Sequence, residues 1–219
     1  LHSFPTRRSS DLGETCTHYL TTTKEVLDNP DFNEAAKFVC SPALRDREDC
    51  EALWQALSDG LLTAVSSDHC GIDVAELKQA GRNDFTQIPN GSPGAGDRLH
   101  MVWTEGVCTG KLTRQKFVDV IATQPAKING IYPRKGTLAV GSDADVVIFD
   151  PNYEGTVHLA DNPNGVDYNL YEGRRQSGRV ETVLLRGQVV VENAKFVGRY
   201  GQGKFIPANM YASGYENRN

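Results

Sequence analysis

The order of three segments in the first third of the chain constrains the fold more than any other feature of the sequence. A short apolar run at residues 36–40 ends at Ser41, before a proline, which is typical of a buried strand that opens into a loop. A second apolar run follows at residues 61–65, and residues 46–60 between the two runs have the pattern of an amphipathic helix. A strand, a helix and a strand with short connections predict a parallel α/β sheet.

The helix expected at residues 46–60 has a start signal, an apolar face and a stop signal. Asp46 is in place to cap its N-terminus, and Gly60 can end it. Its apolar face comprises Leu53, Trp54 and Leu57.

Residues 81–98 are rich in Gly, Pro, Asn and Asp and have no apolar period, which predicts a long loop. Long loops in compact domains are often functional. Two helices are expected after it, the first at about residues 99–108 and the second from Thr113 as its N-cap. Pro125 is expected to start a further short helical turn.

The character of the sequence changes at about Tyr132. The segments that follow are rich in Val and Ile and punctuated by Gly and Asp, which predicts short strands with turns at residues 187–188 and 193–194. From Gly198 the chain is polar and Gly-rich, as expected for a surface tail. Residues 1–12 have neither a helical nor a strand period, and we expect them to be a disordered or non-native leader.

Composition excludes several classes of protein. The 219 residues carry a net charge of −5, which disfavours a broad basic surface for nucleic acid. No stretch approaches the roughly 18 apolar residues of a membrane helix. The five cysteines form no CxxC and each stands alone in its segment, which predicts reduced thiols in the cytoplasm. The chain does not begin with Met, and we expect it to be a fragment or a processed product.

Polar residues follow both expected strands. Ser41 comes after the first strand, Asp68 comes after the second, and the long loop carries Asn90. Active sites of parallel α/β folds lie at the C-terminal ends of the strands, so these three residues are expected to converge on one pocket. Asp68 could ligate a cation or act as a general acid or base, and the alternative is that it caps the segment that follows.

Other polar residues in these segments have structural interpretations. His69 and His18 resemble metal ligands, but hydrogen-bonded structural histidines are the more common case. No G-x-S-x-G surrounds Ser41, which disfavours a hydrolase nucleophile there. Asn90 begins what is most simply a turn, whose backbone groups could serve a site, and Cys70 has no evident partner base.

Several segments occur in an order found in one enzyme family. They are GETCTHYL at 13–20, KFVCSPALR at 37–45, SSDHC at 66–70, FTQIPNGSPGAGDRL at 85–99, AKINGIYPRKGTLAVGSDADVVIFDP at 126–151, VDYNLYEG at 166–173 and VETVLLRGQVVVENAKFVGRYGQGKFIP at 180–207. Together they resemble the C-terminal half of the dihydropyrimidinases, also called D-hydantoinases, of the amidohydrolase superfamily. GSDADVVIFDP alone would mark only the superfamily's β module, whereas the ordered set with SDHC and IPNG is specific to this branch.

The resemblance implies an α/β fold that comprises the C-terminal half of a (β/α)8 barrel and part of a small β-sandwich. Residues 13–132 would then be the second half of the barrel, 133–197 the β-sandwich module and 198–219 a C-terminal tail. In the intact family member it implies a site with two metal ions, usually zinc. That site hydrolyses the cyclic amide of dihydropyrimidines or hydantoins to N-carbamoyl amino acids. The resemblance also implies a cytoplasmic homotetramer when full length, with a small cyclic amide as its substrate.

The resemblance assigns roles to three residues. Asp68 matches the aspartate that ligates one metal and shuttles the proton from the attacking hydroxide to the leaving nitrogen. Ser41 and Asn90 match the residues that hydrogen-bond the substrate imide, the latter chiefly through its backbone. The family's HxH motif, carbamylated lysine and two further histidines have no counterpart in the sequence. We therefore expect these 219 residues alone to be inactive, to aggregate and to hold no zinc, and the leader to come from outside the coding sequence.

Two other functions fit parts of this pattern. The collapsin response mediator proteins share the fold and act as non-catalytic cytosolic scaffolds, but they have lost the strand-end aspartate, which is present here as Asp68. Sister enzymes such as allantoinase or dihydroorotase would keep the mechanism and change the substrate, and the YPRKG and DYNLYEG segments argue against them. A globular α/β fragment without a site of its own is the third interpretation.

Overall fold

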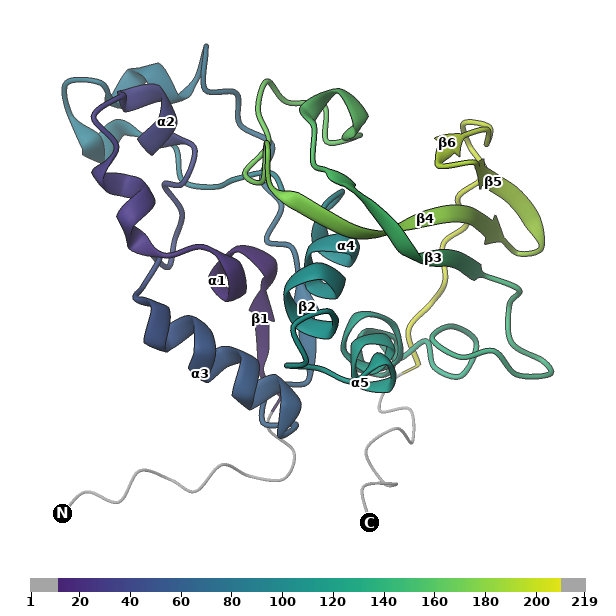
Figure 1. Ribbon diagram of the computed structural model, residues 1–219. Helices are drawn as coiled ribbons and strands as arrows, with labels where there is room; N and C mark the ends of the chain where they lie inside the picture. Colours follow the sequence, from purple (N-terminus) through teal and green to yellow (C-terminus); the bar gives the residue numbers. More distant parts are fainter. Residues whose placement is uncertain (1–11, 210–219) are drawn as a thin grey trace, which may run out of the picture.

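The computed structural model describes residues 12–209. The leader expected at residues 1–12, except for its last residue, and residues 210–219 of the expected tail lie outside the described residues. Figure 1 shows two parts side by side, a parallel strand pair with its helices and an antiparallel sheet. The α/β class is therefore confirmed.

The parallel pair consists of β1, Glu14–Cys16, and β2, Ala64–Ser66, in the register Thr15 to Val65. Between them the chain forms four helical elements: α1 Thr17–Thr21, η1 Lys24–Asp28, α2 Phe32–Ala36 and α3 Arg47–Ser58. A parallel strand pair with a helix between its strands is present, and of the two predicted strands only the second, expected at residues 61–65, overlaps an observed one.

The prediction of a first strand at residues 36–40 is wrong, because the strand that pairs with β2 is β1. Ala36 ends α2, and the carbonyl oxygens after it accept hydrogen bonds from outside the parallel pair. Ser92 Oγ donates to Lys37 O at 2.7 Å, and Gly91 N donates to Val39 O at 3.0 Å. These partners satisfy the backbone without a strand neighbour.

Helix α3 follows its local signals. Asp46 and Asp49 form a reciprocal capping box at its N-terminus, and Trp54 and Leu57 are buried. Gly60, with a φ of +78°, lies just beyond its end in the left-handed region that glycine adopts readily.

The loop expected at residues 81–98 follows the short helical turn η2, Lys78–Gly81, and contains the short helical turn η3, Phe85–Gln87. Two helical segments follow, as predicted. The first joins α4, Arg98–Val102, to a π-helical turn η4, Trp103–Val107. The second joins α5, Arg114–Val118, to a π-helical turn η5, Asp119–Thr123, and then α6, Gln124–Ile128. The side chain of Thr113 caps the second segment by accepting from Lys116 N.

The main core lies between α1, α3, β2 and the two later helical segments. Its buried members include Leu20, Trp54, Leu57, Val65, Val102, Phe117 and Val120. Trp54 also donates its indole N–H to Leu20 O at 2.9 Å, which fixes α3 to the end of α1. This core holds β1 and β2 in place beneath the loops that carry the candidate site.

The second part is an antiparallel sheet in the order β3–β4–β5–β6. Its strands are Val146–Thr156, Arg175–Leu185, Gln188–Glu192 and Lys195–Phe196, and a short helical turn η6, Leu159–Asp161, follows the first. The turn at Asn193-Ala194 is confirmed, whereas the other tight turn is centred one residue earlier than predicted, at Arg186-Gly187. Thr104 in η4 bonds the backbone of Ser177 in β4, which joins the sheet to the helices.

None of the helices in the described part of the chain is long and apolar enough to cross a membrane.

Candidate active site

A cavity of about 630 Å³ lies beside the parallel strand pair, and two of the three predicted site residues line it. Asp68 enters it from the segment that follows β2, and Ser41 enters it from the loop between α2 and α3. Cys16, Tyr19 and Arg45 contribute to the same wall. Residues that are distant in sequence therefore meet beyond the carboxyl ends of β1 and β2, where parallel α/β folds place their sites.

Asp68 has the least usual backbone of the site. Its φ is +46°, in the left-handed region that Asp and Asn tolerate better than most residues. Among the described residues no helix begins directly after it, because the next helical element starts at Lys78. Asp68 therefore caps none of the described helices, and it lines the cavity.

The Ser41 loop is tied to α1, the helix that directly follows β1. The Tyr19 hydroxyl donates to Pro42 O at 2.9 Å, and the Cys40 thiol donates to the same oxygen at 3.3 Å. Burial is the main cause that raises the pKa of Tyr19, and Cys40 and Asp68 raise it further. The phenol therefore stays protonated and remains a hydrogen-bond donor at neutral pH. The position of the Ser41 loop thus depends on a residue of α1.

Asn90 does not line this cavity and is exposed. Its loop is nevertheless bonded to both segments that do: Gly91 N donates to Val39 O, and Cys70 N donates to Ser92 O, both at 3.0 Å. Convergence of all three predicted residues on one pocket is therefore not seen, although their loops are bonded to one another.

The two histidines near the site have different surroundings: His69 is hydrogen-bonded, as expected of a structural histidine, whereas His18 is buried and one of its ring nitrogens has no partner among the described residues. His69 Nδ1 faces the backbone N–H groups of Gly94 and Ala95, at 3.2 and 3.4 Å, and so holds the turn that follows the Asn90 loop. His18 is 4% exposed, and burial lowers its pKa, so its ring is neutral at neutral pH. Its Nε2 has no hydrogen-bond partner in the part of the chain that the structure describes.

The described residues do not form a complete metal site. They contain no group of three or more His, Cys, Asp or Glu side chains placed to hold one ion. A zinc site in an enzyme takes at least three protein ligands. The donor set therefore fits Asp68 as one ligand of a larger site, completed by residues outside the described ones, and does not fit a self-contained centre.

Sequence reasoning missed Tyr19 as a residue of the site. The signal was present, because Tyr19 follows β1 much as Asp68 follows β2, but β1 itself was not predicted. Cys16, the last residue of β1, was missed for the same reason. Its thiol lies 3.1 Å from Ser66 Oγ across the strand pair, and burial raises its pKa.

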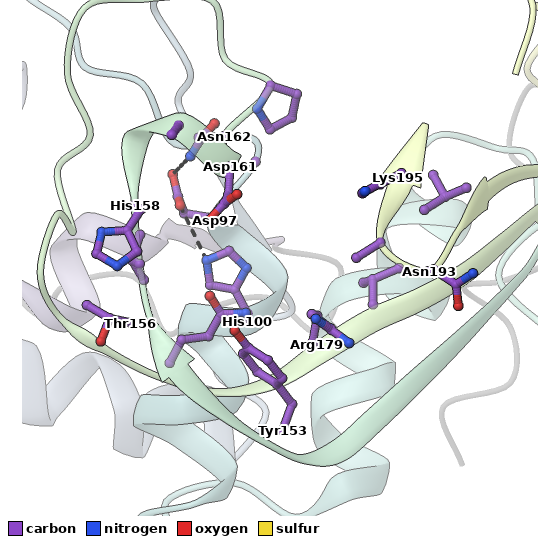
Figure 2. Close-up of a pocket in the computed structure, with 18 residues that line it drawn as sticks. Asp97, His100, Tyr153, Thr156, His158, Asp161, Asn162, Arg179, Asn193 and Lys195 are labelled. Atoms are coloured by element: carbon purple, nitrogen blue, oxygen red, sulfur yellow. Dashed lines mark hydrogen bonds and ion pairs between the residues drawn. The ribbon is translucent and has the colours of Figure 1, made fainter. Parts of the chain in front are cut away.

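A second cavity, of about 580 Å³, contains none of the predicted site residues (Figure 2). Its floor is built on Asp97, which is 1% exposed and accepts from Asn162 Nδ2 at 2.7 Å and Asn169 Nδ2 at 3.1 Å. His100 Nε2 lies 3.3 Å from the same carboxylate. With several side chains directed at it, Asp97 anchors the segment after β3 to α4.

Comparison with known proteins shows which family the chain resembles. A sequence model described as "Amidohydrolase family" matches residues 8–190. The chain is 48% identical over 200 residues to a D-hydantoinase of Ralstonia pickettii, covering 91% of this chain and 43% of that protein. It is 44% identical over 201 residues to a D-hydantoinase of Geobacillus stearothermophilus, covering 92% and 42% of the two chains.

Over most of its length, the chain has a fold similar to that of enzymes of known structure. The crystal structure of dihydropyrimidinase from Brevibacillus agri NCHU1002 matches with a TM-score of 0.90 and 45% identity, over 92% of this chain and 43% of that one. The chain thus spans less than half the length of the relatives it matches. By its sequence and its fold, the chain belongs to the amidohydrolase family.

Proposed function

We propose that the protein containing this chain hydrolyses the ring amide of dihydropyrimidines or hydantoins and releases N-carbamoyl amino acids. The observation that supports this most is the meeting of Asp68 and Ser41 in one cavity beyond two parallel strands. The relatives that match are named D-hydantoinase and dihydropyrimidinase.

The proposed roles follow from the chemistry of each group. Amidohydrolases are generally metal-dependent, and bound zinc would supply a hydroxide nucleophile at neutral pH. Asp68 would ligate one metal and carry a proton to the leaving ring nitrogen. The Ser41 hydroxyl would hydrogen-bond the imide, and the backbone beside Asn90 would complete that contact. A site built to pair an imide rejects rings that lack one, because its own polar groups would stay unpaired.

The described residues contain no group of three or more side chains placed to hold a metal ion, so we propose that the isolated 219-residue polypeptide is inactive and binds no zinc. Activity would need the further ligands of a protein as long as its relatives, which we propose to be a cytoplasmic homotetramer.

The test uses the protein at the length of its relatives, purified with zinc and assayed with dihydrouracil and with hydantoin. We expect ring opening to the N-carbamoyl product, loss of turnover with a chelator, and recovery when zinc is added. Ser41→Ala should raise KM about tenfold, the effect of one lost hydrogen bond to the ring. A folded, zinc-loaded protein that opens neither ring would contradict the proposal and favour the scaffold alternative.

A further inference from the structure

Lys78 is a fully buried lysine at the start of η2, and its ammonium group is bonded to backbone carbonyls. Nζ donates to Ala36 O and to Gly91 O, both at 2.8 Å, and lies 3.4 Å from Val39 O. Lysine is rarely buried without a carboxylate partner, because removing its charge from water is costly. The three carbonyl oxygens use all three of its donors.

Two of these carbonyls, those of Val39 and Gly91, belong to the loops that carry the proposed substrate contacts, and the third belongs to the last residue of α2. Val39 lies two residues before Ser41, and Gly91 directly follows Asn90. Val39 O also accepts from Gly91 N at 3.0 Å, so the two loops meet at the point where the ammonium group is bound. The ammonium group therefore cross-links the backbone of the Ser41 loop to the backbone of the Asn90 loop.

We propose that Lys78 is a positioning residue that fixes the Asn90 loop against the Ser41 loop and so sets the width of the imide-binding site. This inference rests on the proposed function, in which both loops contact the substrate.

The surroundings of Lys78 support a fixed geometry. On the next residue, Gln79 Nε2 donates to Asn33 Oδ1 and to Val74 O, both at 2.8 Å, which holds η2 against α2. Burial lowers the pKa of Lys78 to about 8, and the thiols of Cys40 and Cys70 are the titratable groups that face it. A lysine ammonium is compact and its three donors rotate freely, which suits three separate carbonyls better than the planar fork of arginine.

The experiment compares Lys78→Met with Lys135→Met in the protein at the length of its relatives. Lys135 is a matched control, since its side chain is also mostly buried but contacts Asp143 and Asp145 away from the site. We expect Lys78→Met to raise KM for the cyclic amide about tenfold, with kcat changed less than about threefold, because uniform binding is lost. Lys135→Met should lower Tm without changing KM.

Hydrogen exchange provides a readout that does not depend on turnover. In Lys78→Met the amide of Gly91, which donates to Val39 O, should exchange faster than in the wild type, and in Lys135→Met it should not. If the wild type opens no ring, the proposed function fails, while this exchange still tests the cross-link.

A folded Lys78→Met protein with unchanged KM and unchanged exchange at Gly91 would overturn the inference. If that variant does not fold, Lys78→Gln, whose amide is one bond shorter and has two donors for the three carbonyls, is measured by the same criteria. If neither variant folds, Lys78 is a stability residue and the inference is likewise overturned.

Discussion

The hydroxyl of Tyr19 donates to the carbonyl of Pro42 at 2.9 Å, and this bond ties α1, the helix directly after β1, to the loop that carries Ser41. Tyr19→Phe keeps the ring and removes the bond. We expect stability to fall by about 1 kcal/mol and KM for the cyclic amide to rise severalfold, because the loop gains freedom. Urea unfolding and steady-state kinetics measure the two effects. Tyr153→Phe, in β3, is the control and should leave KM unchanged. An unaltered KM in a folded Tyr19→Phe protein would show that this bond does not position Ser41.

Both the backbone conformation at position 91 and the lack of room for a side chain there require glycine. Its φ is +128°, and an added Cβ would lie 2.5 Å from the Cβ of Cys70. Gly110 is a matched control, with a φ of +79° and open space around it. Gly110→Ala should cost about 1–2 kcal/mol from the backbone alone. Gly91→Ala should cost about 1–3 kcal/mol more and raise KM, since relief of the overlap displaces the Asn90 loop. Equal losses for the two variants in urea unfolding, with KM unchanged, would contradict this.

Asp97 is a purely structural carboxylate in this account. Asp97→Asn places an amide against the donors of Asn162 and Asn169, so the free energy of unfolding should fall by about 2–4 kcal/mol. Asp161→Asn, at an exposed position nearby, should change it by less than about 0.5 kcal/mol. Thermal unfolding of both variants distinguishes them. Equal unfolding temperatures for the two variants would mean that the hydrogen bonds of Asp97 contribute little to the stability of the fold.

Lys78 should give the protein a specific pH dependence of stability. Its pKa is about 8 in the folded chain and near 10.5 when exposed, so between these values the unfolded chain binds more protons. The free energy of unfolding should therefore rise with pH in this window, with a slope of at most about 1.4 kcal/mol per pH unit, and the gain should be absent below pH 8.

Lys78→Met lacks this titration, so the stability difference between wild type and variant isolates it. Urea unfolding at several pH values should show the wild type gaining on the variant from pH 8 upward. Parallel curves would show that the pKa of Lys78 is not lowered in the folded protein.

The sequence predicted those features whose causes are local. Helix α3 was predicted almost to the residue, because Asp46, the apolar period and Gly60 all act within the helix or beside it. The strand predicted at 36–40 failed because an apolar run alone does not identify its hydrogen-bond partners. Those partners, such as Ser92, lie far along the chain.

The candidate site residues were likewise predicted from local sequence, and residues whose position depends on distant pairing were missed. Asp68 and Ser41 were recognised as polar residues beside apolar runs, and both line the cavity. Tyr19 depends on a three-residue strand that exists only through its pairing with β2. Lys78 reads as an ordinary surface lysine in a loop, and only the folded chain shows that it is buried.

Asp68→Asn, in the zinc-loaded protein at the length of its relatives, tests most directly whether this carboxylate performs the chemistry. Asn tolerates the φ of +46° at this position, so the fold should be retained, with Tm within a few degrees of the wild type. Asp84→Asn is the control, because Asp84 is exposed and Asn replaces it well as the cap of η3.

Asp68→Asn should lower kcat for dihydrouracil by roughly 10³-fold or more and reduce the bound metal, while the control keeps both. A folded Asp68→Asn protein with wild-type turnover and metal content would contradict the central claim that this carboxylate performs the chemistry of the site.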